Sequence, residues 1–464
     1  MSVKIHKEVK AAQFIPVAWR PTWFSYSGTE QSVTSNAGIG PMVDLFFDDP
    51  LYGDFHRCLP ERRSNASYRK DLFAMTTLCS AWVGHDAIDD IWEFHEDAGV
   101  REKLGGELPA PKTMGDYYRS FEDEHLNGLG NFLRTQARRY RQQIEPNSPL
   151  VIDMDSTPHV QRGLKIQGVE FNYKNLWCLD SLSAWDELGL CHGFELRKGN
   201  TFSSQGAPEL IAKVFSHLKH GDEKYFRADS AFHNKKCIEA AIRVGAKFTI
   251  TAHGRSNWLD KVLTGGVTHW ERWAYTEDEI EDAKEAEVQL PVIEVGSMLY
   301  QPGWSPNLRF YVVVVKRTLV KDKKTGKDAW KHYGIITNWN LFRTKPQTIV
   351  EWHNRRGNAE NLIKEQKWNY DLLHFPMLKL SANQAYGLLF TVAHNFLRIL
   401  SLLENRNHPM YAKKFRRKFI LIAGRLVWKS SRRIMRMPEH KEREVQGMMK
   451  RWRETFQPLL ARAG

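Results

Sequence analysis

Hydrophobic residues follow two different spacings along the chain, and the change falls near Pro149. Before it, apolar residues recur at helical spacing, as in Tyr68–Trp82, Asp86–Phe94 and Thr113–Ala137. After it, short runs of apolar and β-branched residues alternate with helical stretches. The pattern predicts a mostly helical first region of about 145 residues, followed by a region that combines strands and helices.

The second region predicts three strands, then a helix, a strand, a helix and a strand. Such an order is typical of an α/β fold with a central mixed sheet. Arg197–Asn200 has turn composition and follows the third strand. The expected strands are Val151–Thr157, Val169–Leu182, His192–Leu196, Tyr225–Ala228 and Lys247–Thr251, and the expected helices are Gln205–His220 and Lys235–Val244.

Residues 254–343 interrupt this alternation. Arg309–Val320 is rich in Val and Tyr, Lys321–Asp328 contains a Thr-Gly turn, and Tyr333–Thr337 is again strand-like. These features predict a β-hairpin inside an insertion. A helix is expected to resume near Thr348.

Two stretches are candidates for membrane segments. Met1–Trp19 mixes Lys and His with apolar residues and lacks the apolar run of a signal peptide. Ala385–Leu403 is apolar, but His394, Asn395 and Arg398 interrupt it. We therefore expect a buried helix and no membrane partner.

Charge is concentrated near the end of the chain. The 464 residues carry a net charge of +13, and Tyr411–Glu454 alone holds 15 Lys and Arg against 4 Glu. This concentration favours DNA or RNA as a partner, and a solvated helical face is the alternative. The five Cys form no CxxC pair, which argues against a zinc ribbon or disulfide framework and fits a reducing cytoplasm.

Two Asp residues stand at the ends of expected strands. Asp155 closes the first strand and Asp229 the fourth, although an Asp in this position often only caps a turn. Asp153 competes with Asp155, because strand alternation puts both on one face. Asp155 is preferred because it stands at the end of the strand, before Ser156.

Carboxylates that a fold brings close together have a known chemical use. Two divalent ions about 4 Å apart can activate a water or a 3′-hydroxyl and neutralise the leaving oxygen when a phosphodiester is cut. Mg²⁺ prefers oxygen ligands and keeps several waters, so a few carboxylates suffice to hold it.

A third carboxylate lies on the expected helix Thr348–Trp368. At 100° per residue, five side chains of this helix fall within a stripe about 80° wide. An acidic group within a row of cations fits a metal ligand flanked by phosphate-binding residues. A surface helix with ion pairs such as Glu360 with Lys364 is the alternative. The stripe consists of His353, Arg356, Glu360, Lys364 and Lys367.

These residues resemble a family signature. DDE transposases of bacterial insertion sequences include a branch marked by Tyr, two residues, Arg, three residues, Glu, six residues and Lys. His353, Arg356, Glu360 and Lys367 fit this spacing, with His in place of Tyr. The chain is most similar to the insertion-sequence family numbered thirteen-eighty. Further blocks that look like the family are Thr34–Gly38, Asp153–Thr157, Leu196–Asn200, Arg227–Ser230, Gly357–Lys367 and Ala393–Leu397.

The resemblance implies a ribonuclease-H-like catalytic core with a β-rich insertion before the catalytic Glu. Asp155, Asp229 and Glu360 would be the catalytic triad and the ligands of Mg²⁺, for which Mn²⁺ should substitute. Arg356 and Lys367 would contact DNA phosphates near the transposon end. His353 and Lys364, which share their stripe, are expected to join them.

The resemblance also implies a reaction. Relatives cut double-stranded DNA at terminal inverted repeats and join the freed 3′ ends to target DNA, as homodimers on paired ends in the bacterial cytoplasm, at the nucleoid. They release the first strand through a DNA hairpin while insertion residues hold a flipped base. Trp273 and Trp339 are candidates for that contact here, although each also fits an ordinary core position.

Two other functions stay open. A structure-selective DNA nuclease would share the triad without strand transfer. A DNA-binding protein derived from a transposase would have lost catalysis, but all three carboxylate positions are intact, which counts against it.

These inferences divide the chain into five stretches. We expect a helical DNA-binding or dimerisation region at 1–145, the first part of the ribonuclease-H-like core at 146–253 and a β-rich insertion at 254–343. The core helix that carries the Glu is expected at 344–375, and a helical basic region at 376–464.

Overall fold

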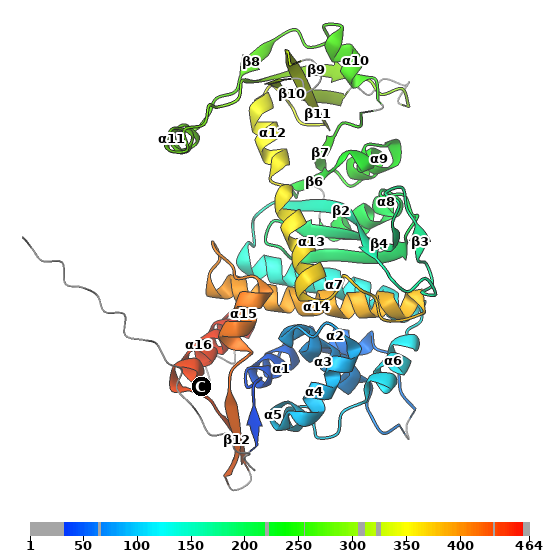
Figure 1. Ribbon diagram of the computed structural model, residues 1–464, viewed down its shortest axis with the longest axis vertical. Coiled ribbons are helices and arrows are strands. Elements are labelled where there is room, and N and C mark those ends of the chain that lie inside the picture. The colour runs from blue at the N-terminus through cyan, green and yellow to red at the C-terminus, as the bar shows by residue number, and fades with distance from the viewer. Residues whose placement is uncertain are drawn as a thin grey trace, which may run out of the picture.

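The computed structural model describes residues 32–63, 66–218, 222–254, 256–304, 311–321, 326–429 and 432–457. A helical body, a central sheet and the strands of the insertion follow one another along the long axis of the molecule (Figure 1). Several sequence expectations lie outside the described residues, namely Met1–Trp19, Arg309, Thr325 and the last two residues of the expected helix Gln205–His220.

Five strands form the central sheet, in the order β5-β4-β2-β6-β7. The first three strands along the chain form an antiparallel meander, and β6 and β7 run parallel to β2. The alternation predicted from the sequence is therefore confirmed. The strands are β2 (Leu150–Val160), β4 (Trp177–Asp186), β5 (Cys191–Lys198), β6 (Lys224–Ala228) and β7 (Lys247–Thr251).

Three strand boundaries differ from the prediction. Strand β2 does not end at Thr157 but continues to Val160, because β4 pairs with it that far. The expected strand Val169–Leu182 is split into β3 (Glu170–Phe171) and β4 by a turn, in which the Asn172 side chain accepts two backbone N–H groups. The expected turn begins only at Gly199, where a Cβ would lie 1.8 Å from a backbone oxygen of β4.

Helices cover both faces of the sheet. α8 (Ala207–Phe215) and α9 (Lys235–Arg243) pack on one face against alternate strand residues such as Met154 and Phe226. The opposite face carries Asp153, Asp155 and Arg227, and α12 (Pro346–Asn354) and α13 (Gly357–Asn369) cross it (Figure 1). The polar side of the sheet is thus the side that holds the expected site.

The insertion extends this sheet from the edge of β7. β11 pairs antiparallel with β7, and the predicted hairpin of β10 with β11 is confirmed. The added strands are β8 (Trp270–Arg272), β9 (Ile293–Tyr300), β10 (Tyr311–Lys321) and β11 (Asp328–Thr337), and the insertion also holds α10 (Trp258–Leu263) and α11 (Glu277–Glu285).

The early helices and the last helices that the structure describes share one hydrophobic core. Helix α14 (Leu380–Glu404) runs through this core between the early helices and α16. It is long and apolar enough to cross a membrane, but 89% of its most apolar window is buried inside the protein, as predicted for a buried helix. The other helices of the body are α1 (Ile39–Phe47), α2 (Tyr52–Arg57), α3 (Lys70–Val83), α4 (Ile91–Glu96), α5 (Ala98–Lys103), α6 (Pro111–Arg119), α7 (Asp123–Ile144), α15 (Ala412–Phe419) and α16 (Glu439–Phe456). A short 3₁₀ turn at Ile88–Asp90 belongs to this body, and a second one at Ser230–Phe232 follows β6 of the central sheet.

The basic C-terminal stretch is not wholly helical, which differs from the prediction. Between α15 and α16 it forms a hairpin of β12 (Gly424–Lys429) and β13 (Arg432–Arg436). Strand β1 (Val33–Thr34) pairs with β12, so the beginning of the described chain and its basic end form one small sheet.

Candidate active site

Asp155 and Asp229 lie at the same level on neighbouring strands. The parallel pairing of β2 with β6 ends at Met154 and Ala228, and each Asp is the next residue. The side chain of Asp229 accepts the backbone N–H of Ala231 at 2.9 Å, which caps the turn after β6. The sheet therefore brings the two expected carboxylates to one edge, although β2 itself runs on past Asp155.

The carboxylates interact electrostatically. Burial first, and then the negative charges of Asp229 and Glu360, raise the pKa of Asp155 to about 6 against the opposing effects of Arg356 and the N–H of Ser156. The three acidic groups are thus close enough to interact, with Asp155 and Asp229 partly buried and Glu360 exposed. A site of this kind favours the arrival of a cation.

Asp153, the alternative to Asp155, has a different role. Its two carboxylate oxygens accept hydrogen bonds from Nε and Nη2 of Arg227 at 2.6 and 2.8 Å. Arg227 is 1% exposed, donates to the backbone oxygen of Trp352 and stacks on its ring at 4.6 Å. Asp153 is therefore committed to a buried ion pair that joins β2, β6 and α12.

Glu360 lies on α13, on a helix that begins later than the sequence suggested. The expected helix Thr348–Trp368 is broken at Arg355 and Arg356, so α12 and α13 are separate helices. Glu360 occupies the first turn of α13, its side chain is 52% exposed, and Nη2 of Arg356 lies 3.6 Å from it. The carboxylate faces the same region as Asp155 but contacts Arg356 in this structure.

His353 is buried and does not lie on the exposed stripe from which its DNA contact was expected. It is 1% exposed, and its two ring nitrogens lie 2.8 and 3.0 Å from the hydroxyls of Thr249 and Thr251 on β7. Burial, followed by the charges of Arg356 and Arg227, lowers its pKa to about 3, so the ring is neutral. The break between the helices turns His353 into the core instead of onto the stripe.

The remaining cations of the stripe differ in exposure. Lys364 is exposed, and Arg356 is partly buried beside Glu360. The ammonium of Lys367 donates to the backbone oxygen of Pro158 at 2.8 Å, and burial lowers its pKa while the charge of Asp155 opposes the change. Lys367 therefore links α13 to the end of β2 close to the carboxylates.

The two Trp candidates for a flipped base are partly buried and pack against other apolar residues. Trp339 lies 4.9 Å from Trp352 and 5.5 Å from Tyr225, measured between ring centroids. Trp273 packs against the cluster between α12 and the insertion strands, with Lys316 over its ring. Both positions agree with the interpretation of each residue as part of a core.

Sequence reasoning missed Arg227 and Tyr333. Arg227 stands opposite Asp153 in the register of β2 and β6. The pair could have been predicted by placing the two strands side by side with both residues on the polar face. Tyr333 donates to or accepts from Thr251 at 3.0 Å and interacts electrostatically with Arg356 and Asp229. No sequence signal pointed to Tyr333, because its position depends on how the insertion pairs with β7.

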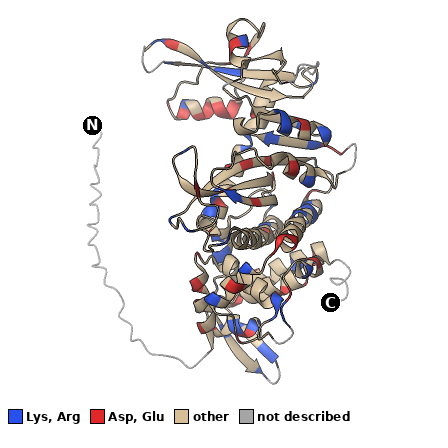
Figure 2. Cartoon of the chain, turned by 90° about the vertical axis from the view of Figure 1, so that its right-hand side faces the viewer, with Lys and Arg blue, Asp and Glu red and all other residues tan. Residues whose placement is uncertain are grey.

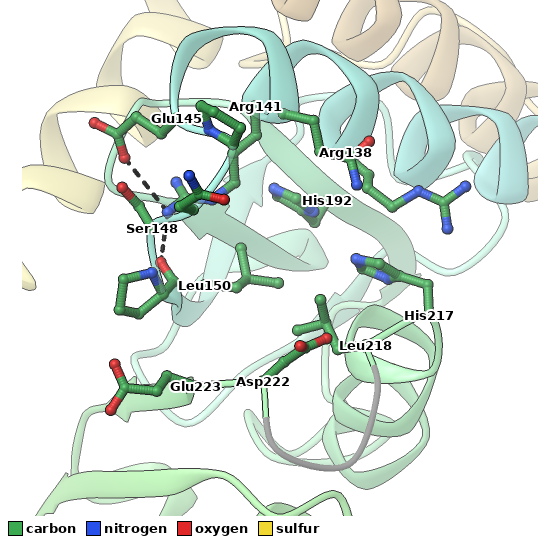
Figure 3. A pocket seen from close by; sticks show the side chains of 14 residues that line it. Arg138, Arg141, Glu145, Ser148, Leu150, His192, His217, Leu218, Asp222 and Glu223 are labelled. Carbon is green, nitrogen blue, oxygen red and sulfur yellow. Dashed lines mark hydrogen bonds and ion pairs between the residues drawn. The ribbon is translucent and has the colours of Figure 1, made fainter.

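A separate cavity lies at the opposite ends of these strands. It has a volume of about 360 Å³ and opens near Leu150, where β2 begins, between α7 and the residues that precede β6 (Figure 3). Arg141, His192 and His217 line it. The cavity therefore does not belong to the carboxylate site.

The carboxylate site fits a divalent metal in its chemistry. Carboxylate oxygens are the donors that Mg²⁺ prefers. The pKa of Asp155 is raised first by burial and then by the charge of Asp229, and a bound cation would neutralise that charge. Across the described ranges, no three His, Cys, Asp or Glu side chains already stand at metal-binding spacing.

The sheet order and the position of the carboxylates define a protein of the ribonuclease-H-like class. The family described as Transposase DDE domain group 1 matches residues 25–453, and the chain belongs to it. Membership implies a DNA-cleaving transposase enzyme, and it accounts for a large mixed sheet with acidic residues at its strand ends. No curated protein matches the chain.

Proposed function

We propose that the protein carries out cut-and-paste transposition of an insertion sequence, cutting at terminal inverted repeats and joining the 3′ ends to target DNA. The observation that carries this proposal is the position of Asp155 and Asp229 at the same level on neighbouring strands, with Glu360 on α13 near enough to act on the pKa of Asp155. The spacing of Arg356, Glu360 and Lys367 supports the bacterial insertion-sequence branch with the Tyr-Arg-Glu-Lys signature.

Asp155, Asp229 and Glu360 would hold Mg²⁺, or Mn²⁺ in its place. When bound, the metal supplies a Lewis acid that activates the attacking oxygen and neutralises the leaving one. The chain orients two of these ligands: backbone N–H groups hold the Asp155 and Asp229 side chains, and the buried pair of Asp153 with Arg227 joins the two strands beside them. Rigid ligands favour a defined metal geometry.

DNA would approach along α13. Arg356 and Lys364 offer charge on the side of the helix that carries Glu360, and Lys367 offers it at the end of β2. Contacts of this kind to phosphates position a duplex without reading its sequence. The enzyme would act as a homodimer on paired ends, with double-stranded DNA as both donor and target.

The test is a cleavage assay on the DNA that flanks the gene of this protein. Wild type, Glu360→Gln and Glu351→Gln would be compared with Mg²⁺ and with chelator. Glu351 is exposed on the neighbouring helix α12 and serves as a matched control. We expect metal-dependent cuts at a pair of inverted repeats for wild type and control, and none for Glu360→Gln.

Other outcomes would favour the alternatives. Cuts that depend on DNA structure and ignore the inverted repeats, with no joining of 3′ ends, would favour a structure-selective nuclease. Binding to the repeats without any cut by wild type would favour a catalytically silent DNA-binding protein. Cleavage by Glu360→Gln at the wild-type rate would remove Glu360 from the site.

A further inference from the structure

The hairpin of β12 and β13 has two faces of opposite character. One face packs on the helical body: Met435 lies against Gly99 of α5, and Arg433 forms an ion pair with Glu102 of the same helix. Leu426 stands opposite Met435 on this face. The hairpin is thus fixed to the body through its inner face.

The outer face carries cations in directly opposed pairs. The register sets Arg425 opposite Arg436 and Lys429 opposite Arg432, and all four side chains are exposed. None of the four has an ion-pair partner among the residues that the structure describes. Like charges directly opposite each other destabilise an antiparallel pair. The repulsion between these opposed cations therefore lowers the stability of the hairpin, so their placement is not explained by a contribution to folding.

Protection of a free sheet edge does not explain the whole pattern either. Charged residues on an edge strand prevent pairing with other chains. Here β13 is the edge strand, but β12 is the central strand of its sheet, between β1 and β13. β1 pairs with β12 only at Gly424 and Arg425, so Arg425 lies between two strands and is not at a free edge.

We propose that this outer face binds duplex DNA, with its four cations on phosphates. A two-stranded ribbon fits the major groove, and Val427 and Ile434 form an apolar pair between the charges that can face the groove. Figure 2 shows the blue strands of this hairpin at the end of the molecule opposite the insertion. This inference deepens the proposed function and rests on DNA being its substrate.

The position of the hairpin predicts which part of the DNA it touches. β12 and the strands that carry Asp155 and Asp229 lie at different levels along the molecule (Figure 1). The hairpin would therefore contact DNA away from the phosphate that is cut. It acts as a positioning surface for the substrate and takes no part in the chemistry.

The experiment measures duplex binding against salt, with chelator present so that no cleavage is involved. The hairpin variant combines Arg425→Gln, Lys429→Gln, Arg432→Gln and Arg436→Gln. The control variant loses the same charge at four cations that have ion-pair partners: Lys213→Gln, Lys235→Gln, Arg443→Gln and Lys450→Gln. The probes are an element-end duplex, a random duplex of equal length and a duplex RNA.

Loss of four phosphate contacts should lower the slope of log affinity against log salt by about 3 to 4. Between 50 and 200 mM salt, the factor by which wild type loses DNA affinity should then be about a hundred times the factor for the hairpin variant. Both DNA duplexes should respond alike, because phosphate contacts do not read sequence. The hairpin variant should melt no lower than wild type, since the opposed charges are gone.

Equal slopes for wild type and the hairpin variant would overturn the proposal. A control variant whose slope falls as much as that of the hairpin variant would also overturn it, and so would a change of slope seen only with duplex RNA. The result is independent of catalysis. If wild type fails to cut any DNA but the hairpin variant loses slope, the proposed transposition is wrong and the DNA surface stands. Normal cutting by wild type with an unchanged slope in the hairpin variant would keep the proposed transposition and remove the hairpin from the DNA interface.

Discussion

Replacement of Asp155 by Asn should stabilise the metal-free protein. The folded protein holds this carboxyl at a pKa of about 6, against an ordinary value of 3.8. At 1.36 kcal/mol for each tenfold change in proton affinity, the ionised carboxylate costs about 3 kcal/mol at neutral pH. The amide that replaces the carboxylate in the variant carries no charge, so the variant avoids this cost.

The sign of the pH dependence follows from the direction of the shift. Because the folded state binds the proton more tightly than the unfolded state, the Asp155 contribution disfavours folding increasingly as pH rises from about 4 to about 6. The difference in unfolding free energy between Asp155→Asn and wild type should be near zero at pH 4. It should reach about 3 kcal/mol at pH 7 and above.

The assay is urea denaturation in chelator at a series of pH values. Asp282→Asn, on the exposed helix α11, provides a control for loss of one negative charge. Added Mg²⁺ should stabilise wild type and leave Asp155→Asn nearly unchanged, because only a protein that binds the ion gains stability from it. A difference that is the same at pH 4 and pH 8, or a variant less stable than wild type at pH 8, would refute the reasoning.

Three further predictions concern neighbouring residues. Arg227→Met should lower the free energy of unfolding by about 3–5 kcal/mol, because it leaves the Asp153 carboxylate buried and unpaired; a loss below about 1 kcal/mol in urea denaturation would contradict this. His353→Gln should cost about 1–3 kcal/mol of stability but leave the salt dependence of DNA binding unchanged, whereas a lower slope would return His353 to the interface. Lys367→Met should reduce that slope by about one, and an unchanged slope would limit Lys367 to its contact with Pro158.

The sequence predicted those features that depend on local periodicity. Apolar strands such as Tyr225–Ala228 and the Val-rich strand of the insertion stand out because alternate or continuous apolar residues face a core. The adjacency of the Asp155 and Asp229 strands came from family resemblance, and the register of β2 with β6 agrees with it. Helix α14 was recognisable because polar residues interrupt an otherwise apolar run.

The remaining features depend on contacts between distant segments. The length of β2 is set by its pairing with β4, and no residue after Thr157 indicates in the sequence that the strand continues to Val160. The break at Arg355 and Arg356 is invisible to helical spacing, which assigned His353 to the wrong surface. The hairpin at 424–436 was missed because a strand whose outer face is charged lacks the apolar alternation by which strands are recognised.

The central claim is that Asp155 ligates the metal and Asp153 does not. Asp155→Cys and Asp153→Cys place the same thiol on the same face of one strand, and a thiolate is a poor ligand for Mg²⁺ but a better one for a softer ion such as Mn²⁺. Both variants would first be checked for folding by circular dichroism, and their cleavage of element-end DNA would then be measured in each metal. We predict that Asp155→Cys is inactive in Mg²⁺ and regains cleavage in Mn²⁺, with no such recovery for Asp153→Cys. Equal activity of Asp155→Cys in both metals, or a recovery confined to Asp153→Cys, would contradict the assignment.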